Sequence, residues 1–358
     1  MLPGRPRILI IALRRLGDVL LTTPLARTLR RGFPQARIEM LVYAGTEGIL
    51  QGNPDVDDVA LAQPRPTAGE TVALIRSIAR RYDLAVSTQT GDRPALLAIA
   101  AGRRRIGLVP RQGGGAWWKQ RAFHGVVAAE PKNHRVVELL RLANCLGIER
   151  HAEVVCPGGA LLAPQAPRGR YAVIHANPMF RYRRWTDAGW RALSRAIADR
   201  GMAIVATGGP DPAERAYLDA LWGSADTPVQ RLDGRLDWPQ IAALLKRATL
   251  YVGADTSMTH LAAATGCPTI ALFGPTDPRL WGPWPKGGLS EIWNAAGTTQ
   301  RRANVWLVQH PLPCTPCQKE GCERHLDSHS ACLVELSAAE VLVAVDQALA
   351  EAADAVIP

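Results

Sequence analysis

Short apolar runs alternate along the chain with longer segments in which apolar residues recur every three or four positions. A continuous apolar run is typical of a strand buried on both faces, and the longer period is typical of an amphipathic helix. Their alternation predicts a parallel α/β sheet. In the first half, the predicted strands are Arg7 to Leu13, Ile38 to Tyr43, Val56 to Leu61, Asp83 to Thr88 and Arg104 to Leu108. The helices predicted there are Val19 to Arg31, a short one ending at Asn53, Thr71 to Arg81, Asp92 to Ala101 and Asn133 to Leu146.

The pattern restarts after Cys156 to Gly169, a segment rich in proline, glycine and alanine that we interpret as a linker. At 358 residues, two domains are expected. We expect residues 1–165 and 170–358 to form two Rossmann-like domains whose parallel sheets face a central cleft. The strands predicted in the second half are Tyr171 to His175, Ala203 to Thr207, Val229 to Leu232, one ending near Val252 and one ending at Phe273. The helices predicted there are Asp187 to Asp199, Asp211 to Leu221, Trp238 to Arg247, one after Ser257, and Ala338 to Ala352, which could cross back onto the first domain.

Residues 251–278 contain several polar residues that could bind a ligand, in the loops between and after two predicted strands. Asp255, Thr256 or Ser257 can cap the intervening helix. The free N–H groups at the start of that helix are suited to bind a phosphate group. His260 lies one turn into that helix and is expected to face the same opening. Ligands of open α/β sheets bind at the carboxyl ends of strands, so a binding site is expected here. Taken singly, each residue is also explained as a helix cap or a surface side chain.

Two other loops carry candidate chemical groups. The first strand leads into Gly17 and Asp18, where a dinucleotide fingerprint would need three spaced glycines, so a nicotinamide cofactor is disfavoured. Asp18 is either a helix cap or a carboxylate that accepts a proton from a hydroxyl nucleophile. In the second half, Arg181, Arg183 and Arg184 are interpreted either as a phosphate clamp or as a solvated basic loop.

Four cysteines lie close together near the end of the chain, with two histidines among them: Cys314, Cys317, Cys322 and Cys332. This spacing is typical of metal ligands. The thiolates could hold a structural zinc or iron ion, or the loop could be reduced and free of metal. A catalytic metal is not expected, because nothing near the cysteines supplies an open coordination position.

Composition narrows the class of partner. The chain is 47% hydrophobic and carries a net charge of +10, which attracts phosphate-bearing partners such as nucleotides, nucleic acids or anionic lipids. Nucleic acid is disfavoured, because aromatic residues make up only 6% and no RNA-binding or helix-turn-helix signature is found. No apolar run is long enough to span a membrane, and the first residues lack a signal-peptide core, so a cytoplasmic location is expected.

Several of these motifs together resemble those of the bacterial family 9 glycosyltransferases, the ADP-heptose:lipopolysaccharide heptosyltransferases. The match runs in order over nearly the whole chain and is most similar to the heptosyltransferase III branch. The resemblance implies a GT-B fold, with transfer of heptose from ADP-heptose to a sugar hydroxyl of the lipopolysaccharide inner core. It also implies inversion at the anomeric carbon and no metal requirement. The matching segments are Ile8 to Ile11, Gly17 to Pro24, His175 to Trp185, Gly208 to Pro210, Gly253 to His260 and Phe273 to Asp277.

The resemblance implies roles for single residues. Asp18 matches the family's general base, which deprotonates the acceptor hydroxyl. Residues Asp255, Thr256, Ser257 and His260 match the motif around the donor's sugar and diphosphate.

Three further residues are implied to bind the donor. Arg183 stands where the family usually has a phosphate-binding lysine, and arginine keeps the charge with a different geometry. Asn177 stands where some members have a hydroxyl side chain. Glu214 matches a carboxylate that holds the donor's ribose.

The implied acceptor, the lipid A–core, lies at the inner face of the cytoplasmic membrane, so peripheral membrane association is expected. The +10 charge suits an anionic leaflet. Candidates for this contact, each also explained as part of a solvated basic face, are Arg103, Arg104, Arg105, Arg111, Trp117 and Trp118.

Two other functions remain open on the sequence. One is a protein heptosyltransferase acting on autotransporter adhesins, since some such relatives hold a metal with four similar cysteines. The other is a non-catalytic nucleotide-binding protein, for which Asp18 is the discriminating residue.

Overall fold

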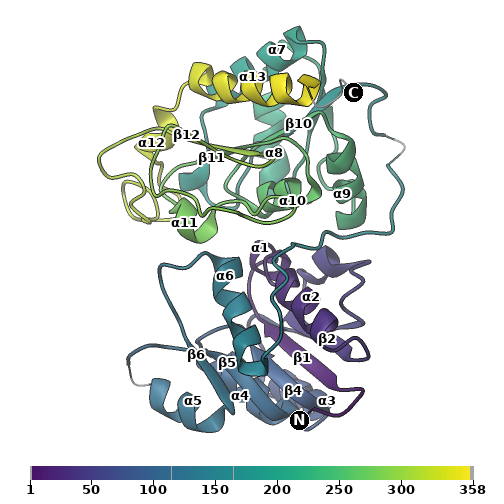
Figure 1. The fold of residues 1–358 in the computed structure, drawn as a ribbon. Helices are drawn as coiled ribbons and strands as arrows, with labels where there is room; N and C mark the ends of the chain where they lie inside the picture. The colour runs from purple at the N-terminus through teal and green to yellow at the C-terminus, as the bar shows by residue number, and fades with distance from the viewer. Residues whose placement is uncertain (1, 114, 164, 355–358) are drawn as a thin grey trace. The chain divides into compact units, whose positions relative to one another are not determined.

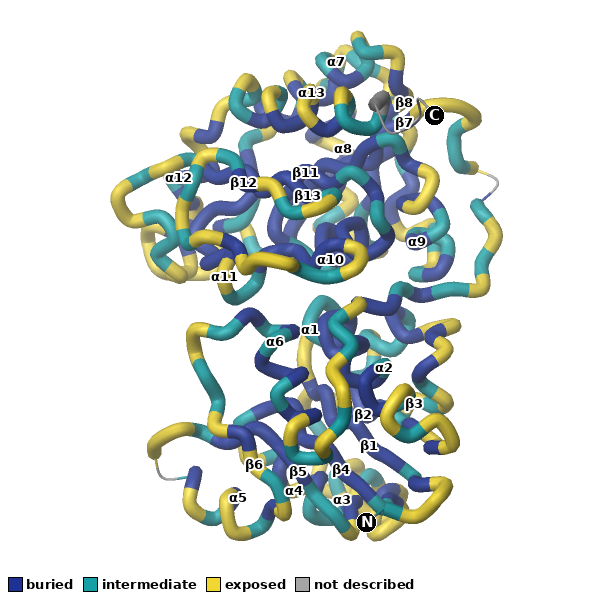
Figure 2. Tube along the Cα trace, in the orientation of Figure 1, coloured by how far each residue is buried: buried dark blue, intermediate teal, exposed yellow. Residues whose placement is uncertain are grey.

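The protein is described here from a computed structural model that covers residues 2–113, 115–163 and 165–354. The chain divides into two compact units, Met1–Gly158 and Gly159–Pro358. Each unit contains one sheet with helices packed on it (Figure 1). The central strands of both sheets are buried, as Figure 2 shows.

In the described part of the first unit, six parallel strands form one sheet in the order β3-β2-β1-β4-β5-β6. The predicted buried strand is confirmed, since every residue of β1 from Ile8 onward is buried. Strands β2 and β4 pair with β1 on either side, and its unbroken apolar run reflects burial of both faces of the sheet. The strands are β1 (Arg7–Ala12), β2 (Arg37–Tyr43), β3 (Asp58–Ala62), β4 (Tyr82–Ser87), β5 (Gly102–Val109) and β6 (Gly125–Ala128).

The helices of the first unit follow the prediction with local corrections. Pro24 divides the predicted helix Val19 to Arg31 in two, because proline is tolerated only in a first helical turn. The helical segments are α1 (Leu16–Leu20), α2 (Thr23–Gly32), η1 (Glu47–Leu50), α3 (Ala68–Ile78), α4 (Asp92–Ala101), α5 (Ala116–Ala122), α6 (Arg135–Leu140) and η2 (Arg141–Leu146).

Two elements of the first unit were not predicted. Helix α5 contains Trp117 and Trp118, in a segment to which no helix was assigned because glycines precede it; Gly114 lies outside the described residues. The edge strand β6 was not predicted, because its four residues are too few for a periodic signal.

In the described part of the second unit, seven strands form a sheet in the order β12-β13-β11-β10-β7-β8-β9. All neighbours are parallel except β12, which pairs antiparallel with β13. The strands are β7 (Tyr171–His175), β8 (Ala203–Ala206), β9 (Val229–Arg231), β10 (Leu250–Ala254), β11 (Thr269–Phe273), β12 (Thr299–Arg302) and β13 (Val305–Gln309). The helical segments are η3 (Arg181–Arg183), α7 (Asp187–Asp199), α8 (Pro212–Gly223), α9 (Trp238–Arg247), α10 (Ser257–Thr265), α11 (Pro278–Trp281), α12 (Ala331–Val334) and α13 (Ala338–Asp354).

The last helix, α13, is part of the core of the second unit. Its residues Val341, Ala344 and Val345 are buried in one cluster with Trp190 and Leu193 of α7. Helix α13 therefore packs on α7 and on the sheet of its own unit (Figure 1). The final residues, 355–358, lie outside the described part of the chain.

Candidate functional site

Three predicted segments of the second unit meet at the carboxylate of Asp255, directly after β10. Asp255 is only 5% exposed, and its Oδ2 lies 2.9 Å from Nη1 of Arg183. The same oxygen accepts a hydrogen bond of 2.6 Å from Oγ1 of Thr276, which follows β11. Nη1 of Arg183 also lies 3.4 Å from the main-chain oxygen of Asp255. A single buried carboxylate thus joins the η3 turn to the ends of two neighbouring strands.

The guanidinium of Arg183 is fixed in place by its surroundings. Burial opposes its charge, but Asp255 and Tyr182 together outweigh this cost and the pKa of Arg183 is raised. The rings of Phe180 and Tyr182 lie 5.8 and 5.5 Å from its central carbon. A planar cation held this way presents its donors in a fixed direction, as a phosphate clamp requires.

The turn before α10 differs from the predicted cap. Thr256 stands at the N-cap, but its side chain makes no capping hydrogen bond. Asp255 does not cap the helix either, since its carboxylate is engaged by Arg183 and Thr276. Ser257 is the first residue of α10, and His260 is buried one turn further along. The expectation of a side-chain cap is therefore wrong, and the first N–H groups of α10 are not taken up by one.

Asn177 and Glu214 also lie beyond strand ends of this sheet. Asn177 is buried just after β7, and among the residues described its Oδ1 accepts no hydrogen bond. Glu214 is in the first turn of α8, with its carboxylate against the Gly208–Gly209 turn. A Cβ at Gly209 would lie 2.7 Å from Oε2 of Glu214, so a larger residue there would force the carboxylate to move.

His175, the last residue of β7, is a buried neutral group. Burial lowers its pKa to about 4, and a hydrogen bond to the carbonyl of Thr207 opposes this only partly. Its Nδ1 lies 3.1 Å from that carbonyl oxygen. The ring therefore packs and positions the end of β7 without carrying charge at neutral pH.

In the first unit, Asp18 lies in the first turn of α1, beyond the end of β1. The N-cap of α1 is Arg15, so Asp18 is not the cap, and one of the two predicted roles is excluded. Its Oδ1 lies 3.6 Å from Nε of Arg135 and 4.0 Å from Nη1 of Arg14. Nη2 of Arg135 donates to the carbonyl of Thr88, at the end of β4.

Arg135 and Thr276 were not predicted as site residues. Arg135 was placed inside a long predicted helix, and the available signal was a charged residue at the start of an otherwise apolar segment. Thr276 was placed at the correct edge of the sheet. Its hydrogen bond to Asp255 could not be predicted, because it depends on β10 and β11 being neighbours in the folded sheet.

The cysteines do not form the predicted metal site. Within the described residues, no group of three or more His, Cys, Asp or Glu side chains is placed to hold a metal ion. Burial, with contributions from the charges of the other three cysteines, raises the pKa of Cys332 to about 11. Cys314 and Cys322 are exposed and Cys317 is partly so. The expected structural zinc or iron site is therefore not found among the described residues.

The cysteine-bearing segment, residues 314–332, instead makes hydrogen bonds to the backbone beside Arg183 and Thr276. Ser330 donates a 2.6 Å hydrogen bond to the carbonyl of Tyr182, the neighbour of Arg183. The N–H of Gln318 donates to the carbonyl of Pro275, the neighbour of Thr276. This segment thus holds the backbone of both turns.

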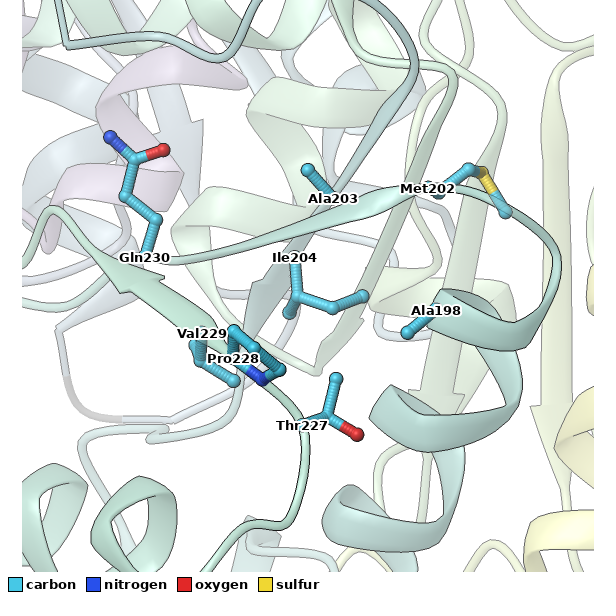
Figure 3. Close-up of a pocket in the computed structure, with 8 residues that line it drawn as sticks. All are labelled: Ala198, Met202, Ala203, Ile204, Thr227, Pro228, Val229 and Gln230. Atoms are coloured by element: carbon cyan, nitrogen blue, oxygen red, sulfur yellow. The ribbon is translucent and has the colours of Figure 1, made fainter.

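A surface hollow of about 460 Å³ lies elsewhere in the second unit, as Figure 3 shows. It is lined by Ala203 at the start of β8 and by Val229 at the start of β9. The hollow is therefore at the amino ends of the strands, whereas Asp255 and Thr276 follow carboxyl ends. It is not part of the candidate site.

Solved structures define the class of fold. The chain is similar to the Escherichia coli structure titled ADP-heptose lps heptosyltransferase II, with a TM-score of 0.72, 18% identity, and coverage of 96% of this chain and 99% of that one. It is also similar to E. coli heptosyltransferase WaaC with ADP-2-deoxy-2-fluoro heptose, with a TM-score of 0.69, 21% identity, and coverage of 95% and 99%. The two sheets therefore form the GT-B fold of glycosyltransferases, as predicted.

Sequence comparison defines the family. Residues 71–323 match glycosyltransferase family 9 (heptosyltransferase). Lipopolysaccharide heptosyltransferase 3 from Escherichia coli is 30% identical over 295 residues, covering 77% of this chain and 86% of that protein. The chain belongs to glycosyltransferase family 9 and is a heptosyltransferase. Each helix in the described ranges is too short or too polar to cross a membrane.

Proposed function

We propose that this enzyme transfers heptose from ADP-heptose to a sugar hydroxyl of the lipid A–core of lipopolysaccharide, with inversion at the anomeric carbon. The observation that carries the donor half of the proposal is the Arg183–Asp255–Thr276 cluster beside the start of α10. The names of the relatives support the choice of donor and acceptor, since they include lipopolysaccharide heptosyltransferases and a heptosyltransferase bound to an ADP-heptose analogue.

In this proposal the second unit binds the donor diphosphate. The first N–H groups of α10, beside Thr256 and Ser257, donate to phosphate oxygens at a helix N-terminus. Arg183 has five N–H donors, so pairing with Asp255 through Nη1 leaves others for a phosphate. Both contacts strengthen as negative charge grows on the departing ADP. This assigns charge stabilisation to protein groups rather than to a metal ion.

The remaining donor contacts are assigned by position. Glu214, beside the Gly208–Gly209 turn, accepts hydrogen bonds from the ribose hydroxyls. Asn177, with its buried Oδ1, follows the carboxyl end of β7. His260 lies in α10, which follows the carboxyl end of β10 at the same edge of the sheet. We place them around the sugar and diphosphate.

Asp18 is proposed as the general base in the first unit. Its carboxylate takes the proton of the acceptor hydroxyl, and the hydroxyl oxygen forms a bond to the anomeric carbon. The bond from that carbon to the diphosphate oxygen breaks, and ADP leaves with the electron pair. Accordingly, residues 1–165 bind the acceptor and residues 170–358 bind the nucleotide sugar.

We also propose that the enzyme works at the cytoplasmic face of the inner membrane, bound peripherally. Helix α5 supports this, because Trp117 is 58% exposed and the guanidinium of Arg121 lies 5.7 Å from its ring. Exposed tryptophan beside basic side chains suits the headgroup region of an anionic leaflet.

The first test compares ADP, UDP, GDP, CMP and NAD for their effect on thermal unfolding. A ligand that binds only the native state stabilises it by about 2.7 kcal/mol at a hundredfold excess over its Kd. We expect a shift with ADP alone among these compounds. Turnover is then measured with ADP-heptose and a truncated core acceptor, and the anomeric configuration of the product is determined by NMR. A shift with UDP or NAD but none with ADP would rule out the proposed donor.

A further inference from the structure

The side chains of Asp18 and Arg135 are largely shielded from solvent. The side chain of Asp18 is 13% exposed and that of Arg135 is 10% exposed. Nε of Arg135 lies 3.6 Å from Oδ1 of Asp18, which is close enough for strong attraction but too long for a direct hydrogen bond. Within the described part of the chain, neither of these two atoms has a hydrogen-bond partner.

The position of Arg135 is not explained by the stability of its own helix. Arg135 is the first residue of α6, where the helix dipole disfavours a cation. Burial also works against the charge and lowers the pKa of Arg135 to about 10, with the charge of Asp18 as the main opposing influence. A residue that violates two local preferences at a strand end is more often kept for function than for folding.

A hydrogen bond nevertheless anchors the guanidinium, and a cap fixes the helix that carries it. Nη2 donates a 3.1 Å hydrogen bond to the carbonyl of Thr88, and the side chain of Thr88 is bonded to the carbonyl of Ile11 in β1. At the other end, the side chain of His134 accepts the N–H of Val136 and caps α6. Arg135 is therefore tied to the segment after β4 and, through Thr88, to the end of β1, the strand that precedes Asp18 and α1.

We propose that Arg135 is a positioning residue that compensates the charge of Asp18 and orients its carboxylate for proton transfer, which rests on the function proposed above. The guanidinium supplies a compensating charge to the buried side of the carboxylate. Because the contact is not a direct hydrogen bond, it leaves the oxygen lone pairs of the carboxylate able to accept a proton. Arg135 thus acts on the reaction through Asp18 and not through the substrate.

The other charged groups around Asp18 are expected to influence its carboxylate less than Arg135 does. Arg14, from the loop before α1, lies 4.0 Å away, but its side chain is 43% exposed and solvent screens its charge. Glu138 on α6 accepts bonds from Asn133, Arg141 and the N–H of Glu130. Glu47, on η1 beside α1, accepts the N–H of Gly45. Arg135 is thus the best-placed cation to compensate Asp18.

The experiment is the pH dependence of kcat/KM for the purified full chain with ADP-heptose and a truncated core acceptor. Removing a fixed cation disfavours an ionised carboxylate beside it. For Arg135→Met, we expect the acid limb of the profile to move to higher pH. Because the carboxylate also loses its fixed orientation, the rate at pH 7 should fall about 100-fold. The KM for ADP-heptose should stay within about twofold, since the donor site is in the other unit.

Further variants separate charge from packing. Arg135→Gln removes the charge but keeps an N–H donor for Thr88, so the same shift is expected even if Arg135→Met does not fold. Arg135→Lys keeps the charge, and its acid limb should stay near that of the parent, with a rate reduced several-fold. Arg14→Met should shift the limb by less. Arg37→Met removes a 64% exposed cation at the opposite edge of the sheet and should change nothing.

The outcomes distinguish this inference from the proposed function. Asp18→Asn should abolish turnover while ADP still stabilises the protein. If Asp18→Asn is inactive but the neutral Arg135 variants keep the parent acid limb, the role of Arg135 is wrong and the general base stands. If Asp18→Asn is fully active, both assignments fail.

Discussion

Thr276 donates a 2.6 Å hydrogen bond to Oδ2 of Asp255, the same oxygen that lies 2.9 Å from Nη1 of Arg183. One buried carboxylate oxygen therefore connects a hydroxyl from the end of β11 with a guanidinium from η3. The geometry makes Asp255 the residue that orients Arg183, and Thr276 the residue that orients Asp255. Substitutions of Asp255, of Thr276 and of Ser330, which bonds the backbone next to Arg183, test this arrangement.

Asp255→Asn should reduce both stability and donor affinity. The substitution leaves Arg183 largely buried without its carboxylate, and breaking a buried ion pair costs about 3–5 kcal/mol. Because Arg183 is 28% exposed, we expect about 2–3 kcal/mol less free energy of unfolding in urea, with ADP binding at least tenfold weaker by calorimetry. As a matched control, Asp346→Asn breaks an exposed pair with Arg200 and should cost under about 1 kcal/mol. Equal effects of the two substitutions would contradict the role given to Asp255.

Thr276→Val keeps the shape of the side chain and removes its hydroxyl donor. The buried oxygen of Asp255 then loses one partner, which costs about 1–3 kcal/mol. We expect a similar loss of unfolding free energy and ADP binding that is several-fold weaker. Thr276→Ser keeps the donor and should restore most of both quantities. If the valine variant binds ADP like the parent, Thr276 does not position Asp255 for the donor.

Ser330→Ala tests whether the cysteine-bearing segment supports the donor site. The substitution removes the 2.6 Å bond to the carbonyl of Tyr182, a buried group next to Arg183. The expected result is a loss of about 1–2 kcal/mol in stability and a rise of several-fold in the KM for ADP-heptose. Ser224→Ala, which removes an exposed hydroxyl at the end of α8, should leave both unchanged. An unchanged KM in Ser330→Ala, despite lost stability, would limit this segment to a folding role.

His175 should make the stability depend on acid pH. Burial lowers its pKa in the folded state to about 4, while an unfolded chain titrates near the ordinary value of about 6.5. The unfolded state therefore binds the proton first, so this contribution is fully present above pH 6.5 and is lost as the pH falls towards 4. Between pH 8 and pH 5, we expect roughly 2 kcal/mol to be lost through this group.

The measurement for His175 is urea unfolding of the parent and of His175→Gln at pH 8, 6.5 and 5. The variant has no group to titrate at this position, so its stability should fall less than that of the parent over the same range. Parallel pH dependence in the two proteins would mean that His175 is not the group responsible.

Much of the fold could be predicted because its signals are local. The bounds of β7, α4, α7 and α9 agree with the prediction, since apolar periodicity and capping residues are contained within each element. The prediction missed α5, β6, β12 and β13. In the second sheet, β12 and β13 are short, and the antiparallel pairing of β12 depends on the neighbour that it meets after folding.

The sequence by itself determined which residues stand at the ends of the strands, including Asp18, Arg183 and Asp255. Only the tertiary structure decided which side chains meet: Asp18 with Arg135, and Asp255 with Thr276 and Arg183. It also decided that the four cysteines are not arranged as metal ligands among the described residues. The physical reason is that periodicity and capping act over a few residues. Contacts between distant residues depend on strand order and register, which the packing of the whole unit selects.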